Sequence, residues 1–136
     1  MSSSQSPEQE HSPILTIDLK KCRIRIYKQT LHLLDGPEYI QFLVKPDKRI
    51  LAVRPGTPKD ISPQKIYWKT LTDKKQCCEF YSKSLIAHLR QLINTQTGDY
   101  TYKVVGSIND IRNRVFFDLS QSEVINEEAE AVTICK

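Results

Sequence analysis

A stretch of sixteen residues near the start of the chain recurs, in altered form, 54 positions further on. Thr16–Leu31 aligns without a gap on Thr70–Leu85, with five identical positions and several conservative pairs. The identities include Lys20-Lys21, which falls on Lys74-Lys75. With two copies at a long spacing, the pattern indicates a fused pair of half-domains rather than a solenoid of many repeats.

The first copy predicts the order strand, strand, helix, strand, strand. Arg23–Ile26 alternates basic with aliphatic residues, the period-two pattern of a strand with one buried face. Asp35-Gly36-Pro37 is expected to end the helix, because Gly favours the left-handed closing position and Pro cannot continue a helix. The expected elements are strands at 14–19, 23–26, 39–44 and 49–53 and a helix at 28–34.

The second copy predicts the same order with longer parts. Residues 66–71 and 76–80 are expected to pair as a hairpin around a turn at 73–75. A helix follows to about Ile93, with Ser82 or Ser84 as its cap, since a hydroxyl there satisfies an unpaired backbone amide. The expected closing hairpin uses strands at 100–105 and 115–119.

These elements divide the chain into five segments around one compact α+β domain at 13–119. The segments are a disordered tail at 1–12, a first repeat at 13–55, a linker at 56–64, a second repeat at 65–119 and an acidic tail at 120–136. The linker is rich in proline, and the N-terminal tail has too few apolar residues to bury a core.

The body of the chain is basic and its ends are acidic. Residues 14–118 hold nineteen Lys and Arg against ten Asp and Glu, a net charge of +9, although the whole chain carries only +4. This asymmetry indicates an anionic partner such as nucleic acid. The alternative is an ordinary soluble surface.

The sequence offers little for catalysis or cofactor binding. The three histidines are far apart, and none has metal-ligand spacing with a cysteine or an acid. With four glycines there is no Gly-rich phosphate loop. We therefore expect no enzyme activity and no cofactor. No signal peptide or membrane-length apolar run is seen, so a cytoplasmic protein without membrane contact is expected.

The residues from Asp18 to Pro55 resemble the AbrB/MazE/MraZ group of proteins. The likeness rests on Arg23-Ile24-Arg25-Ile26, followed by the short helix and the closing hairpin. The resemblance implies a swapped-hairpin β-barrel built from two fused strand–strand–helix–strand–strand repeats, as in MraZ-like members. Cys22 and Tyr27 stand where the family usually has Gly and Pro.

The same resemblance implies a DNA-binding transcriptional regulator whose basic hairpins contact duplex DNA. The expected contacts are Lys20, Lys21, Arg23, Arg25, Lys74 and Lys75, which form one surface if the two hairpins adjoin. The alternative is that these cations occupy the solvent face of an amphipathic strand and protect its edge. In the second copy, Cys77 and Glu79 replace Arg23 and Arg25.

Two other functions stay open. The first is a protein-interaction module without DNA binding, suggested by Glu79 at the position of Arg25. The second is toxin neutralisation, as in the antitoxin members of the group, with a protein partner bound by the acidic tail at 123–130. A homo-oligomer is compatible with all three functions.

Overall fold

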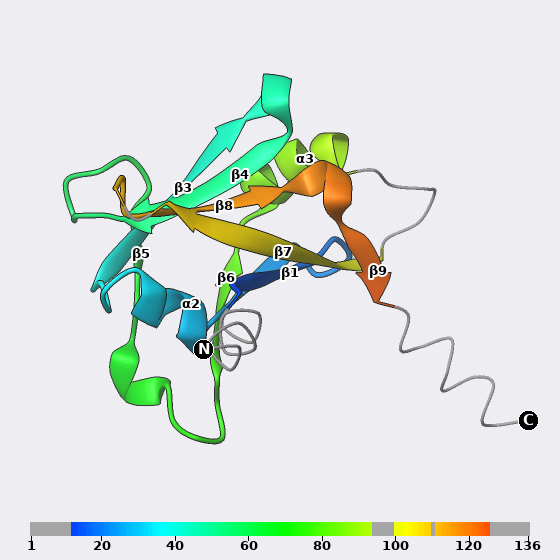
Figure 1. The fold of residues 1–136 in the computed structure, drawn as a ribbon. Coiled ribbons are helices and arrows are strands. Elements are labelled where there is room, and N and C mark those ends of the chain that lie inside the picture. Colours follow the sequence, from blue (N-terminus) through cyan, green and yellow to red (C-terminus); the bar gives the residue numbers. More distant parts are fainter. Residues whose placement is uncertain (1–11, 94–99, 110, 126–136) are drawn as a thin grey trace, which may run out of the picture.

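The computed structural model describes residues 12–93, 100–109 and 111–125. They form a small α+β fold, a nearly closed antiparallel β-barrel with two helices (Figure 1). The strands are β1 (Ile14–Asp18), β2 (Arg23–Tyr27), β3 (Tyr39–Lys45), β4 (Ile50–Pro55), β5 (Gln64–Lys65), β6 (Cys77–Tyr81), β7 (Thr101–Asn109), β8 (Arg114–Asp118) and β9 (Glu123–Ile125), and the helices are α2 (Lys28–Leu33) and α3 (Lys83–Leu92).

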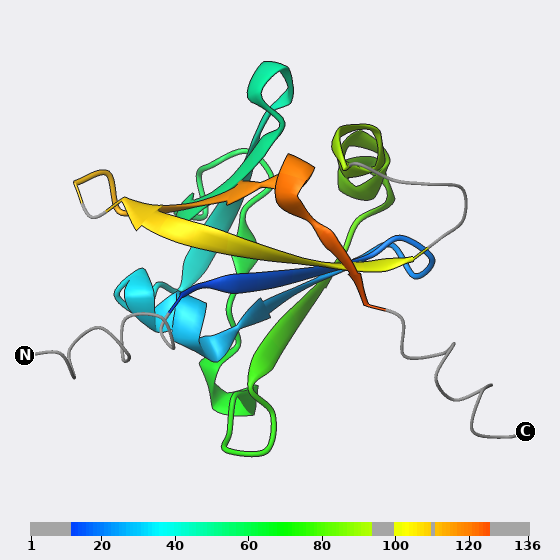
Figure 2. The same cartoon turned by 45° about the vertical axis from the view of Figure 1, so that its right-hand side comes forward.

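The strands follow the order β5-β3-β4-β8-β7-β1-β2-β6, and β9 adds to β7. Strand β7 is long and joins two parts of the barrel, since residues 101–105 pair with β1 and residues 106–109 pair with β8. Figure 2 shows β7 crossing the molecule between these two partners. The two ends of the order, β5 and β6, are not paired with each other, so the barrel is open there.

The barrel interior is filled by the inward-facing members of each strand. On β2 the alternation predicted from the sequence is confirmed, because Ile24 and Ile26 are buried while Arg23 and Arg25 lie on the outer face. Each fully buried aliphatic side chain contributes about 1.5–3 kcal/mol to folding. The largest fully buried side chains are those of Tyr102, Phe117, Leu15, Ile17, Leu19, Ile24, Ile26, Leu31, Leu34, Ile40, Leu51 and Ile86.

Both helices lie where the sequence predicts them. Helix α3 begins after Ser82, whose hydroxyl accepts a hydrogen bond from the Leu85 amide at 3.1 Å. Helix α2 is followed by Gly36 in the left-handed conformation, with φ of 59°. The Gly36 amide donates to the carbonyl oxygen of Leu31 at 2.9 Å, which closes the helix.

The hairpin expected between residues 66–71 and 76–80 does not form. Strand β5 is two residues long and pairs with β3, and the chain then turns through a short 3-10 helix at Trp68–Thr70. The Trp68 indole donates to the carbonyl oxygen of Pro37 at 2.7 Å and packs against the His32 ring. This docking holds the segment against the first half of the chain, away from β6.

The first residues of the expected acidic tail include a strand. Glu123–Ile125 form β9, which pairs with residues 101–103 of β7. Glu123 stands directly opposite Lys103 in this pairing. The remainder of the expected acidic tail, and residues 1–11 of the expected N-terminal tail, lie outside the described residues.

Gly106 marks the point where β7 changes partner, and we predict that it is intolerant of a side chain. A Cβ atom there would lie 2.7 Å from the Phe116 carbonyl oxygen and 2.7 Å from the Phe117 ring. Gly106→Ala should therefore lower the free energy of unfolding by about 1–3 kcal/mol, as overpacking of a dense interior does. Urea denaturation measures this loss. The matched control is Ser107→Ala at the neighbouring exposed position, expected within about 0.5 kcal/mol of wild type. An equal effect of the two substitutions would contradict the prediction.

Candidate nucleic-acid interface

The expected DNA-contacting arginines lie on a ribbon formed by β2 and β6. The two strands are antiparallel, with Arg25 opposite Glu79 and Arg23 opposite Tyr81. The amide of Ser82 donates to the carbonyl oxygen of Cys22, so the hydrogen-bonded pairs are those of the even-numbered residues. Arg25 and Glu79 therefore form a non-hydrogen-bonded pair, in which side chains approach most closely.

Both arginines are held by carboxylates. Arg23 Nη2 lies 3.0 Å from Asp18 Oδ2, and Arg23 Nη1 lies 3.5 Å from Glu79 Oε2. Arg25 Nε donates to the same Glu79 oxygen at 2.9 Å. The outer face of the ribbon is thus an ion-pair network of two cations and two anions, and it carries no net charge.

The network shifts the pKa values of Glu79 and Arg23 toward their charged forms. Burial alone raises the pKa of Glu79, but the hydrogen bond and charge of Arg25, with the charge of Arg23, leave it below its ordinary value. Burial alone lowers the pKa of Arg23, but its interactions with Tyr81, Glu79 and Asp18 leave it above its ordinary value. Glu79 and Arg23 therefore remain ionised at neutral pH.

The two arginines differ in how much of their surface remains available. The Arg23 side chain is 13% exposed and the Arg25 side chain is 36% exposed. Arg23 is thus mainly a structural cation between two carboxylates, whereas Arg25 keeps one open side. In the sequence, Glu79 is an acidic residue at the position where the first copy has the basic Arg25. The structure identifies it as the partner of both arginines.

Lys20 and Lys21 lie in the exposed turn between β1 and β2. Asp18 Oδ1 accepts a hydrogen bond from the Lys21 amide at 3.1 Å, which fixes the turn. The hydrogen bond from Ser82 to Cys22 brings the start of α3, with the exposed Lys83, beside this turn.

Lys74 and Lys75 lie in the exposed turn that precedes β6. The hydroxyl of Thr72 accepts hydrogen bonds from both lysine amides, each at 3.2 Å. The Lys28 amide donates to the carbonyl oxygen of Gln76 at 2.7 Å, so a further cation lies beside this turn. Among the described residues, no carboxylate lies within 4.0 Å of an ammonium group of these four turn lysines.

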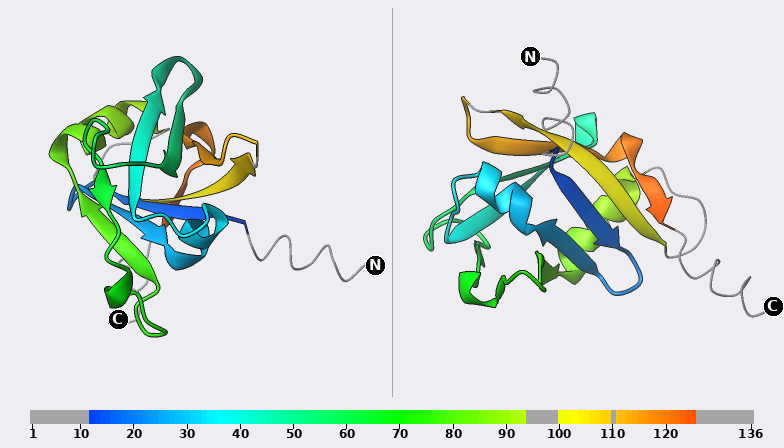
Figure 3. Two further views of the ribbon diagram at one scale, coloured as in Figure 1. Left: turned by 90° about the vertical axis from the view of Figure 1, so that its left-hand side faces the viewer. Right: turned by 60° about the horizontal axis from the view of Figure 1, so that its bottom comes forward.

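The two lysine turns do not meet. Strands β2 and β6 are antiparallel, so the turn before β2 lies beside the end of β6, and the turn before β6 lies beside the end of β2. The right-hand view of Figure 3 shows the two turns apart along one side of the molecule. The outermost hydrogen-bonded positions of the ribbon, Cys22–Ser82 and Lys28–Gln76, are six residues apart, or roughly 20 Å at a rise of about 3.3 Å per residue, and the lysine pairs lie beyond them. The six expected contacts are thus two lysine pairs at the ends of a ribbon and two paired arginines at its centre.

Within the described ranges, no group of three or more His, Cys, Asp or Glu side chains is placed to hold a metal ion. In the same ranges, no helix has both the length and the apolar character needed to span a bilayer.

Comparison with protein-family models, with curated proteins and with solved structures finds no match to this chain.

We predict that Glu79 makes stability depend on pH. Because its pKa is lowered in the folded state, its contribution is complete above the unfolded-state pKa of about 4.3 and is lost as the pH falls through the folded-state value. Glu79→Gln should cost about 1–2 kcal/mol at pH 7 and almost nothing near pH 2, as measured by urea denaturation across pH. The control is Glu123→Gln, which removes an exposed carboxylate outside the network. A Glu79→Gln cost that is the same at both pH values would contradict this role.

Proposed function

We propose that the protein binds duplex DNA, as a transcriptional regulator does, with the β2–β6 ribbon facing the duplex. The observation that carries the proposal is the pair of unneutralised lysine turns at the two ends of the ribbon. Lysine ammonium groups without carboxylate partners are free to neutralise phosphates, and phosphate neutralisation supplies most of the affinity of such proteins.

The dimensions of the ribbon suit this role. The edge of the sheet formed by β2 and β6 would enter the DNA major groove, which is about 12 Å wide and admits a two-stranded ribbon. The lysine pairs, which lie beyond the two ends of a paired segment of roughly 20 Å, would then reach phosphates at each end of the contact. Arg25, the more exposed arginine at the centre of the ribbon, would face the base edges.

We also propose that the barrel is a fused pair of repeats of the AbrB/MazE/MraZ kind. The 54-residue shift that superposes the two sequence copies places Arg25 on Glu79, and these two residues face each other across the ribbon. The symmetry can be tested by exchanging the labels of β1 with β5, β2 with β6, β3 with β7 and β4 with β8. Six of the seven neighbouring strand pairs are then recovered. The seventh pair, β1–β2, has no counterpart, because β5 and β6 are not paired with each other and the barrel is open there. Under this exchange the two lysine turns are equivalent, which suits the two-fold symmetry of a DNA backbone.

The prediction is a salt-dependent complex that depends on both turns. Lys20→Glu with Lys21→Glu, and separately Lys74→Glu with Lys75→Glu, should each weaken binding by about tenfold or more. Each should also lower the slope of log affinity against log salt by about 2, because two phosphate contacts are lost. A gel-shift titration with random duplex DNA at several salt concentrations measures both quantities.

The control reverses the same number of charges elsewhere. Lys45→Glu with Lys48→Glu alters the exposed turn between β3 and β4, which lies at the far end of the molecule from the β6 turn (Figure 1). This variant should retain the wild-type salt slope. Absence of any complex at low salt, or equal loss in all three variants, would end the proposal.

A second candidate function is recognition of a peptide strand, and the free edge of β6 favours it. Even-numbered residues of β6 hydrogen-bond toward β2, so the backbone groups of Cys77, Glu79 and Tyr81 point the other way. Within the described part of the chain no strand pairs with that edge. An unpaired edge can accept an added strand from a protein partner.

The lysine variants separate the two functions. A protein captured equally by wild type and by both turn variants would support strand recognition, because main-chain pairing does not need the lysine charges. Partner binding by the acidic tail, and homo-oligomer formation, stay predictions from the sequence.

A further inference from the structure

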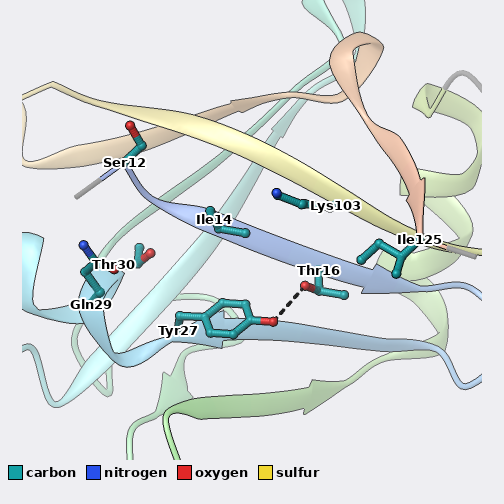
Figure 4. Close-up of a pocket in the computed structure, with 8 residues that line it drawn as sticks. All are labelled: Ser12, Ile14, Thr16, Tyr27, Gln29, Thr30, Lys103 and Ile125. Carbon is teal, nitrogen blue, oxygen red and sulfur yellow. Dashed lines mark hydrogen bonds between the residues drawn. The ribbon is translucent and has the colours of Figure 1, made fainter. Parts of the chain in front are cut away.

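A pocket of about 310 Å³ lies on the outer side of the sheet, where β1, β2, β7 and β9 meet the start of α2 (Figure 4). Its polar lining consists of Ser12, Thr16, Tyr27, Gln29, Thr30 and Lys103. Its apolar walls are Ile14 and Ile125. None of these lining residues is acidic.

Three polar side chains from neighbouring strands line the pocket. The Tyr27 hydroxyl and Thr16 Oγ1 are 3.2 Å apart and share a hydrogen bond. Lys103 stands directly opposite Thr16 in the β1–β7 register, so its side chain emerges on the same face of the sheet. In Figure 4 the Lys103 side chain lies on the β7 side of the pocket, and the hydrogen-bonded Thr16 and Tyr27 lie on the β1 and β2 side. Glu123 on β9 stands opposite Lys103 in the β7–β9 register. No carboxylate of the described residues, however, lies within ion-pair distance of the Lys103 ammonium group.

Thr30 provides an independent observation that points to a ligand. Its side chain is fully buried, with 0% exposure, and its hydroxyl has no hydrogen-bond partner. Buried hydroxyls are nearly always hydrogen-bonded, because an unsatisfied one loses its interaction with water without replacement. A ligand oxygen or nitrogen in the pocket would satisfy this group.

We infer that this pocket binds a small organic acid. The carboxylate would accept a charge-assisted hydrogen bond from the Lys103 ammonium group and a second hydrogen bond from the Thr16–Tyr27 pair, in which one hydroxyl donates to the other and the second is left to donate to the ligand. The hydrocarbon body would lie against Ile14, Ile125 and the Tyr27 ring. The volume is at the lower end of the range for small-molecule sites, and the pocket offers both apolar surface and polar groups, as such sites do.

The apolar walls distinguish this ligand from a phosphate group. A DNA backbone phosphate or free phosphate would gain from Lys103 but would leave Ile14 and Ile125 in contact with a hydrated anion. An organic acid uses both parts of the pocket. The inference is independent of DNA binding, because the pocket contains none of the four turn lysines.

The test is an NMR titration of the full chain with four probes. Phenylacetate and 3-methylbutanoate supply the carboxylate and an apolar body, phenylacetamide has the same shape as phenylacetate without the charge, and inorganic phosphate has the charge without the body. We expect the two acids to shift the resonances of Ile14, Tyr27 and Ile125, with a Kd on the order of 1 mM for probes this small. The amide and phosphate should bind at least about tenfold more weakly.

Variants assign the binding to this pocket. Lys103→Met, which retains most of the side-chain bulk, should weaken binding of phenylacetate about tenfold or more, and Thr30→Val about threefold or more. The control is Lys65→Met, which removes an exposed cation on β5 and should leave the Kd unchanged. Unperturbed resonances at millimolar acid would overturn the inference. Retained affinity in folded Lys103→Met, or phosphate binding as tight as that of the acids, would overturn it as well.

Discussion

Closure of the barrel depends on strand pairing between the two halves of the chain. The pairs β1–β2, β3–β4 and β7–β8 are local hairpins, but β1–β7, β2–β6, β3–β5 and β4–β8 each join a strand before residue 56 to one after residue 63. Neither half can cover its apolar face alone. Folding must therefore wait for contacts between residues far apart in sequence, which have a high loop-closure cost and slow the folding of β proteins.

The order of elements was largely predictable from the sequence, because it depends on local patterns. Alternation on β2, the Ser82 cap and the turn at Gly36 act over a few residues, and each is seen where the pattern placed it. The pairing of β5 was not predictable, since it is decided by a tertiary contact of Trp68 with Pro37. Strand β9 is three residues long and is held by its pairing with β7, a long-range contact that its own sequence does not specify.

The six residues predicted to contact DNA show the same difference between what local patterns and what tertiary contacts decide. Sequence position identifies Lys20 and Lys74 as turn residues, and both are exposed in turns. The spacing could not predict that the two turns lie at opposite ends of the ribbon, since that follows from the antiparallel direction of β2 and β6. It also could not show that Glu79 neutralises Arg23 and Arg25. A hint was present in the sequence, because Glu79 aligns on Arg25 with the opposite charge.

The docking of Trp68 gives the molecule a built-in optical reporter. It is the only tryptophan of the chain, and its indole lies in the segment between β5 and β6, hydrogen-bonded to Pro37 and 5.4 Å from the His32 ring centroid. Its fluorescence follows release of this connection from α2 rather than the melting of the barrel interior. Emission and far-ultraviolet circular dichroism thus observe two different parts of the same molecule, and any difference between their transitions measures how tightly the halves are coupled.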